Sequence, residues 1–172
     1  EKGFLNSDDV QILRLASLLH DIGHGPFSHL FEEVVQEKKI SHEDYGKKII
    51  LNSEIGHILS KTGFNKKLVT QIAFGESKFQ YLNEIVSGAL SADMMDYLLR
   101  DGYFTGAEHA KVDHKRITQS LSVHKKKIAL ERSALYSFES MMHSRYQMFK
   151  AVYFHKTVRS AEVMLIQALR LS

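Results

Sequence analysis

Three histidines and an aspartate crowd the stretch LLHDIGHGPFSHLFE at residues 18–32. His20 and Asp21 are adjacent, and His24 and His29 follow within nine residues of His20. Imidazole and carboxylate groups together suit divalent transition metals, and imidazole also transfers protons near neutral pH. The stretch is therefore a candidate metal-binding or catalytic segment.

The adjacent pair His20 and Asp21 also has a purely structural interpretation. On a regular helix neighbouring side chains point about 100° apart, so the pair chelates one ion only at a frayed helix end or with ligands from elsewhere. In the alternative, His20 is a buried, hydrogen-bonded core histidine and Asp21 belongs to a terminal turn. Gly23 and Gly25 favour a tight bend that gathers the titratable groups, which supports the metal site.

A second polar group lies in SADMMDYLLRDGYFTG, residues 91–106. Asp93, Tyr97 and Arg100 are spaced so that they share one helix face, and Asp96 can pair with Arg100 one turn later. A carboxylate, a phenol and a guanidinium on one face indicate a binding surface. The alternative is an ion-paired strip facing solvent.

A third group lies in RYQMFKAVYFHK, at residues 145–156. Four of its residues follow helical spacing, with Tyr153 close to the same face: Arg145, Phe149, Val152 and Lys156. The arginine guanidinium can bind a phosphate through two parallel hydrogen bonds. A solvated basic helix is the alternative.

The composition favours one globular domain over residues 1–172. The chain has 44% hydrophobic residues, one proline and no cysteine. The hydrophobic content is enough for one ordinary core, and the lack of cysteine excludes disulfides and thiolate metal sites within the chain. With neither a signal sequence nor a membrane-length apolar run, we expect a soluble, cytoplasmic protein. The net charge of +3 is mild, so nucleic-acid binding is disfavoured.

The pattern along the chain predicts an all-α fold. Ser7 is expected to cap a first helix ending near Gly23, Pro26 to open a second, and Ser41 to open a third through a capping box. Further helices are expected over about 54–62, 65–74, 81–88 and 91–101, and over 133–171 as one long or two consecutive helices. Residues 121–130 predict a short surface hairpin around three lysines. The last helical region should bury four residues: Tyr136, Met148, Val152 and Leu165.

Three blocks, LLHDIGHGPFSH, SADMMDYLLRDGYFTG and VYFHKTVRSAE, occur in this order. Together they resemble the HD superfamily of metal-dependent phosphohydrolases, specifically its deoxynucleoside triphosphate triphosphohydrolase-like branch, over nearly the whole chain. The resemblance implies an HD-domain helical bundle in which the hairpin is an insertion. Because the chain starts at Glu1, almost directly with a helix, we interpret it as a fragment lacking its N-terminal portion.

The resemblance implies a metal site formed by His20, Asp21 and Asp93. The family has a further ligand, a histidine on an upstream helix, which has no counterpart before His20. The ion would be Mn, Fe, Zn, Ni or Mg, and it would polarise a phosphoryl oxygen and lower the pKa of a bound water.

The resemblance also implies roles for other side chains. His42 matches a catalytic histidine, expected to protonate the leaving oxygen while Glu43 or another carboxylate orients it. His24 and His29 resemble active-site histidines that contact phosphates, and we expect His24 to take part in catalysis as well. The phosphate and sugar contacts of the family match four residues: Tyr97, Asp101, Arg145 and Tyr153. Lys156, by its charge, is expected to help Arg145 neutralise the polyphosphate. Met94 stands where many triphosphohydrolases have a basic residue.

The predicted function is metal-dependent hydrolysis of a dNTP to deoxynucleoside and tripolyphosphate, by a protein that forms a homo-oligomer. Two alternatives remain. One is a phosphomonoesterase or phosphodiesterase acting on another nucleotide. The other is a catalytically silent nucleotide-binding regulatory module, consistent with Met94 and with the missing upstream ligand.

Overall fold

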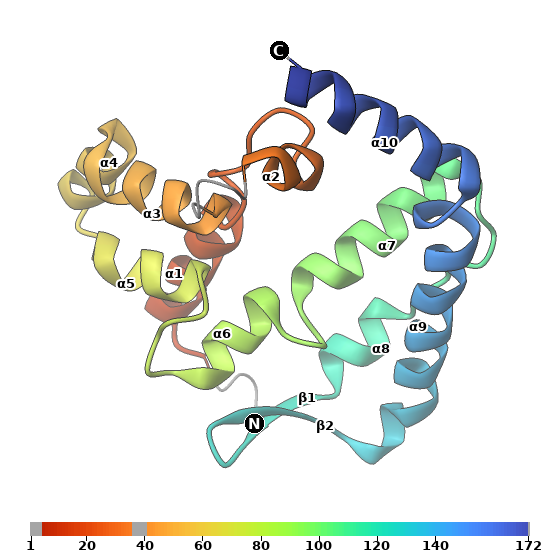
Figure 1. Ribbon diagram of the computed structural model, residues 1–172. Helices are drawn as coiled ribbons and strands as arrows, with labels where there is room; N and C mark the ends of the chain where they lie inside the picture. Colours follow the sequence, from red (N-terminus) through yellow and green to blue (C-terminus); the bar gives the residue numbers. More distant parts are fainter. Residues whose placement is uncertain (1–4, 36–40, 172) are drawn as a thin grey trace.

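Helices make up most of the computed structural model, which describes residues 5–35 and 41–171 (Figure 1). The α-helices are α1 Ser7–Leu19, α2 His29–Val35, α3 His42–Asn52, α4 Glu54–Lys61, α5 Lys66–Ala73, α6 Gln80–Ser87, α7 Ala92–Thr105, α8 His114–Gln119, α9 Leu135–Met148 and α10 Lys156–Leu171. Strands β1 Leu121–His124 and β2 Lys127–Leu130 form an antiparallel hairpin. The predicted all-α fold with a hairpin is confirmed.

The first helix starts and ends earlier than its sequence suggested. Its cap is Asn6, whose side-chain oxygen accepts a hydrogen bond from the Asp9 backbone N–H at 2.8 Å. The prediction of Ser7 as cap was wrong, because asparagine caps as well as serine and Asp9 completes the capping box. The helix ends at Leu19 rather than near Gly23, so Asp21 lies in the turns that follow.

The second helix begins at His29, and Pro26 lies in the turn before it. The prediction that Pro26 opens this helix was therefore wrong. Phe27 and Ser28 have φ angles of 65° and 47°, in the left-handed region that cannot continue a right-handed helix. The third helix starts as expected, because Ser41 and Asp44 form a capping box.

The C-terminal region forms two helices joined by an irregular turn. A 3-10 turn, Arg132–Ala134, precedes α9, and a π-helical turn, Phe149–Tyr153, separates α9 from α10.

Two helices in the middle of the chain differ from the prediction. Helix α8 was not predicted. Helix α7 continues past the expected end at Asp101 to Thr105, where Gly106 closes it with a φ of 69°.

Two hydrophobic clusters support the fold. One joins α1 to α3, α4, α5 and α6, and the other joins α7, α8 and α9. Met148 is fully buried and Val152 packs against the second cluster, as predicted, and Leu165 is half-buried. Tyr136 was wrongly assigned to the core: it is 82% exposed near the start of α9, on a part of the helix that no other element covers in the described residues.

The helices stand in two groups in Figure 1. Helices α1, α3, α4 and α5 lie on the left, α7, α8 and α9 on the right, and α6 lies between them above the hairpin. Helix α10 crosses the top and contacts α2, so the end of the described chain meets the segment carrying His29. The hairpin is tied to α6 because the Ile128 backbone N–H donates to Glu84 at 2.6 Å.

Candidate metal and phosphate site

The end of α1 presents His20 in one defined tautomer. Its Nδ1 lies 2.8 Å from the Ser17 carbonyl oxygen. A carbonyl oxygen only accepts, so Nδ1 carries the proton and Nε2 is left to bind an ion. Nε2 lies 3.3 Å from Asp21 Oδ1 and 3.8 Å from Asp93 Oδ1. The helix end thus brings adjacent residues together where a regular helix would separate them.

Helix α7 brings Asp93 to the same place. Ser91 caps this helix by accepting from the Met94 backbone N–H, which puts Asp93 in the first turn. One coordinating atom each from His20, Asp21 and Asp93 lies within 4.8 Å of the other two. One imidazole and two partly exposed carboxylates fit a hard or borderline divalent cation. The donor set therefore matches the metal that the resemblance implied.

A second group of side chains centres on the carboxylate of Glu32. Its Oε1 accepts from the His42 backbone N–H at 2.8 Å and lies 2.5 Å from His42 Nδ1. Its Oε2 lies 3.2 Å from His29 Nδ1. Burial opposes ionisation of Glu32, but these hydrogen bonds outweigh it and lower the pKa of the carboxyl to about 2. Glu32 is therefore a carboxylate at neutral pH.

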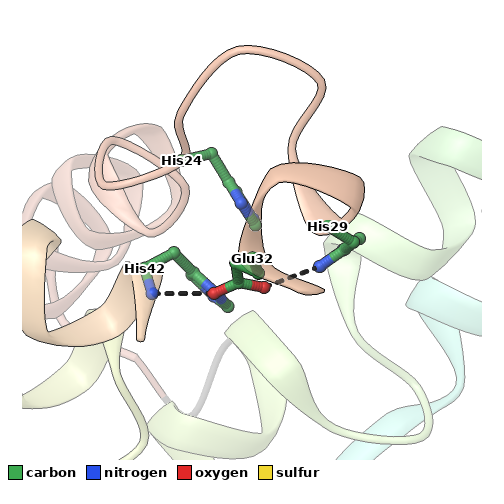
Figure 2. A group of neighbouring side chains, drawn as sticks. All are labelled: His24, His29, Glu32 and His42. Carbon is green, nitrogen blue, oxygen red and sulfur yellow. Dashed lines mark hydrogen bonds and ion pairs between the residues drawn. The ribbon is translucent and has the colours of Figure 1, made fainter. Parts of the chain in front are cut away.

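His24 connects the two groups. Its ring stacks on His42 with centroids 4.0 Å apart and meets His29 edge-on at 4.7 Å (Figure 2). Its Nε2 lies 3.6 Å from Asp21 Oδ1. Burial, followed by the neighbouring His42, lowers the pKa of His24, which favours the neutral ring.

Gly23 allows the loop after α1 to pack against α3. A Cβ there would lie 1.9 Å from the His42 carbonyl oxygen and 2.5 Å from the Gly46 nitrogen. The glycine was expected to serve a tight turn, yet its φ is not in the left-handed region. Its role is close packing of backbone on backbone, which sets His24 beside His42.

A cavity of about 880 Å³ joins the two groups. Its lining holds seven of the predicted site residues: His20, Asp21, His24, His29, His42, Asp93 and Tyr97. Arg100 also lines it, paired with Asp96 as the spacing predicted. In the described part of the chain this lining includes neither Glu43, exposed in the first turn of α3, nor Lys156, exposed in the first turn of α10.

Tyr97 links the cavity to the remaining predicted residues. Its ring meets Tyr153 edge-on with centroids 6.4 Å apart, and the Tyr153 hydroxyl donates to Asp101 Oδ2 at 2.6 Å. Burial raises the pKa of the Tyr97 phenol, and the Arg145 guanidinium opposes the rise. The π-helical turn carries Tyr153, and such turns are frequent at functional sites.

Met94 is buried directly behind Asp93. It is 3% exposed, and its sulfur accepts a contact from Arg145 Nη1 at 3.2 Å. The position at which the resemblance anticipates a basic residue thus serves as a support for Arg145.

Glu32 is the site residue that the sequence interpretation missed. A carboxylate was expected to orient His42, but the one that contacts it is Glu32, ten residues upstream, rather than its neighbour Glu43. One signal was available, because His29 and Glu32 are three residues apart and share a helix face. Glu32 and His42 lie on two different helices, α2 and α3, and periodicity within one helix does not predict a contact between helices.

Comparison with known proteins identifies the family. Residues 2–101 match the HD domain, and residues 112–172 match the HD associated region. This chain therefore belongs to the HD-domain phosphohydrolase superfamily. In the described residues, no helix combines the length and the apolar character needed to cross a membrane.

Relatives resemble this chain over most of its length. The uncharacterized protein YwfO of Bacillus subtilis is 40% identical over 167 residues, which are 95% of this chain and 38% of that protein. The deoxynucleoside triphosphate triphosphohydrolase SAMHD1 homolog of Dictyostelium discoideum is 30% identical over 176 residues, covering 93% of this chain and 33% of that protein.

A solved structure extends the similarity to the fold. A phosphohydrolase from Bacteroides thetaiotaomicron superposes with a TM-score of 0.84 at 34% identity, over 98% of this chain and 40% of that one. The chain thus spans two fifths or less of the length of these three proteins.

Proposed function

We propose that the protein hydrolyses deoxynucleoside triphosphates to deoxynucleoside and tripolyphosphate in a metal-dependent reaction. The observation that carries the proposal is a cavity whose lining holds both the donor set of His20, Asp21 and Asp93 and the ring of His42, which Glu32 contacts. Its volume of about 880 Å³ is within the range of pockets that enclose small ligands.

His20, Asp21 and Asp93 would hold the divalent cation. When bound, the cation supplies a Lewis acid that polarises a phosphoryl oxygen and favours ionisation of water. The Ser17 carbonyl holds the His20 ring in the orientation that presents Nε2. The carboxylates of Asp21 and Asp93 supply the negative charge that neutralises the cation.

His42 would supply the proton that the reaction requires. Water adds to the α-phosphorus and loses a proton to the solvent, the bond between that phosphorus and the 5′ oxygen breaks, and the 5′ oxygen takes up the proton from His42. Glu32 engages Nδ1 of His42, so Nε2 is the atom that donates. The ionised Glu32 stabilises the charged ring before the transfer and fixes its direction.

The remaining residues would bind the substrate. His24 and His29 line the cavity beside His42 and suit phosphate oxygens. Arg145 contacts Met94 and Tyr97 behind the lining and would supply a guanidinium. Tyr97 and Tyr153 offer aromatic faces and hydroxyls to the sugar, next to the carboxylate of Asp101. The Dictyostelium relative is named as a deoxynucleoside triphosphate triphosphohydrolase, which supports a dNTP as the substrate.

The test uses the full-length protein with each dNTP, alone and mixed, in the presence of Mn²⁺ or Mg²⁺. Wild type should release tripolyphosphate and free deoxynucleoside in a one-to-one ratio. The control Glu108→Ala, which removes an exposed carboxylate outside the cavity, should release the same amounts as wild type, and Asp93→Ala should release neither product. Product formation by Asp93→Ala would overturn the metal assignment.

Absence of tripolyphosphate from every dNTP would overturn the proposed reaction. Release of inorganic phosphate from nucleotide mono- or diesters would then indicate the esterase alternative. Binding of a nucleotide without turnover would indicate the regulatory module. Homo-oligomer formation remains a prediction, checked by the mass of the protein in solution.

A further inference from the structure

Four side chains converge beside the proposed cation site. Figure 2 shows His24 reaching down from the loop, His29 and Glu32 extending from α2, and His42 from the start of α3, all toward one point. One coordinating atom from each lies within 4.8 Å of the other three. His20, Asp21 and Asp93, assigned above to the catalytic cation, are not members of this group.

The donor set of this cluster differs from that of the first site. Three imidazoles and one carboxylate are the ligands of tetrahedral zinc, whereas two carboxylates and one imidazole suit harder cations. In a tetrahedral site the four ligand atoms lie roughly 3.3 Å apart, given bonds of about 2.0–2.1 Å. The observed spread therefore closes around an ion with small side-chain shifts.

Hydrogen bonds inside the protein do not satisfy the cluster. Glu32 is the acceptor for both His29 and His42, while Nδ1 of His24 is buried without a hydrogen-bond partner in the described residues. An unpaired buried nitrogen is costly, and coordination would remove that cost.

The exposure of the four side chains leaves an entry path. His24, Glu32 and His42 are 13%, 20% and 23% exposed, whereas His29 is 77% exposed. An ion can first meet His29 at the surface and then be enclosed by the inner three ligands.

The backbone before His29 is strained in a way that serves the cluster. Phe27 and Ser28 adopt left-handed conformations although neither is glycine. These two residues turn the chain so that His29 approaches His42, with ring centroids 5.9 Å apart. Strain of this kind persists where the surrounding structure holds a functional group in place.

We infer that His24, His29, Glu32 and His42 form a second cation site, selective for Zn²⁺, whose occupation blocks the active site. The inhibitory consequence rests on the proposed function. Zinc on the cluster would withdraw His42 from proton donation and His29 from phosphate. The protein would then be activated by Mn²⁺ at the first site and inhibited by Zn²⁺ at the second.

The binding test uses Co²⁺, whose visible absorption is intense in tetrahedral sites and weak in octahedral ones. Full-length wild type and Asp93→Ala should both give the intense band, because the first site does not contribute to it. His29→Ala should lose it and bind Zn²⁺ more than about 100-fold more weakly, since even outer contacts change affinity 10–100-fold. His57→Ala, which removes an exposed histidine of α4, should match wild type.

Replacement of the outer ligand by a different one gives a second test. His29→Cys should restore a tetrahedral spectrum and add a thiolate-to-cobalt band relative to full-length wild type. The 172 residues of this sequence contain no cysteine, so within them the added thiolate can only be residue 29. The site is refuted if the tetrahedral band survives in His29→Ala, disappears in Asp93→Ala, or is absent from wild type.

Activity measurements separate the two proposals. Zn²⁺ added to the Mn²⁺-loaded protein should inhibit wild type with the affinity found by spectroscopy. If the protein makes no tripolyphosphate but the cobalt spectra behave as expected, the cation site stands and the proposed reaction fails. Activity that persists with the cluster saturated by Zn²⁺ would overturn the inhibitory role.

Discussion

Glu32 Oε1 accepts a hydrogen bond from the His42 backbone N–H at 2.8 Å and lies 2.5 Å from His42 Nδ1. A single carboxylate therefore fixes both the start of α3 and the direction of the imidazole that this helix carries. The half-buried start of the helix gains a partner for its free N–H, and the ring gains one orientation. Structure and proposed chemistry depend on the same oxygen atom.

Glu32→Gln should lower kcat about 10- to 100-fold while leaving KM nearly unchanged, because the ring loses its charged partner but the cavity keeps its shape. Steady-state kinetics of dNTP hydrolysis would measure this split. Glu33→Gln, an exposed neighbour, is the matched control. A rise in KM at constant kcat would show that Glu32 serves substrate binding instead.

Gly23→Ala should destabilise the fold by about 1–3 kcal/mol and also weaken metal binding, because its Cβ would collide with the His42 carbonyl and push α3 away from the loop. Gly63→Ala is a matched comparison. It meets no atom within 4 Å but must adopt a φ of 86°, at a cost of about 1–2 kcal/mol. Chemical denaturation and metal titration of both variants distinguish the effects: equal metal affinity in the two would contradict the packing role of Gly23.

Tyr153→Phe should destabilise the protein by about 1–2 kcal/mol at neutral pH, because Asp101 loses its donor. Burial, together with the hydrogen bond to Asp101, raises the pKa of Tyr153 above its ordinary value of 10.0. The neutral phenol is thus the stabilising form, and its contribution is complete below pH 10.0 and is lost as the pH rises further.

The free energies of unfolding of wild type and Tyr153→Phe should therefore converge above pH 10.0. Urea denaturation between neutral and alkaline pH measures the gap. Tyr103→Phe, 82% exposed on the same helix as Asp101, should match wild type throughout. A gap that widens with pH would reverse the assigned direction.

Met148→Ala should cost about 2–5 kcal/mol, because Met148 is fully buried in the second cluster. Tyr136→Ala, on the same helix, should cost less than about 0.5 kcal/mol, since its ring is 82% exposed. Thermal or urea denaturation of the pair tests the division between core and surface on α9. Similar losses in the two variants would contradict it.

The spacing of apolar residues was enough to predict the hairpin and the helices other than α8, because burial against a core imposes that spacing. It was not enough to place the ends of helices. Local hydrogen bonding makes Asn6 rather than Ser7 the cap of α1. Packing of the loop between α1 and α2 sets the left-handed conformations of Phe27 and Ser28. Tyr136 was misassigned because spacing identifies a face but not what covers that face.

For the candidate site, too, the residues could be predicted but the local structure that brings them together could not. The resemblance named His20, Asp21 and Asp93, and the structure brings these three together. Their convergence depends on α1 ending at Leu19, whereas the sequence pattern predicted an end near Gly23. Glu32 was not predicted because its contact with His42 joins two different helices, α2 and α3.

The contact of α10 with α2 bears on how this fold can be divided. Residues 2–101 and 112–172 match two separately described regions, yet α10 from the second rests on the helix that carries His29 and Glu32. Tyr153, also from the second, donates to Asp101 in the first. The two regions are interlocked, so an exchange of one between relatives would transplant half of a site rather than a module.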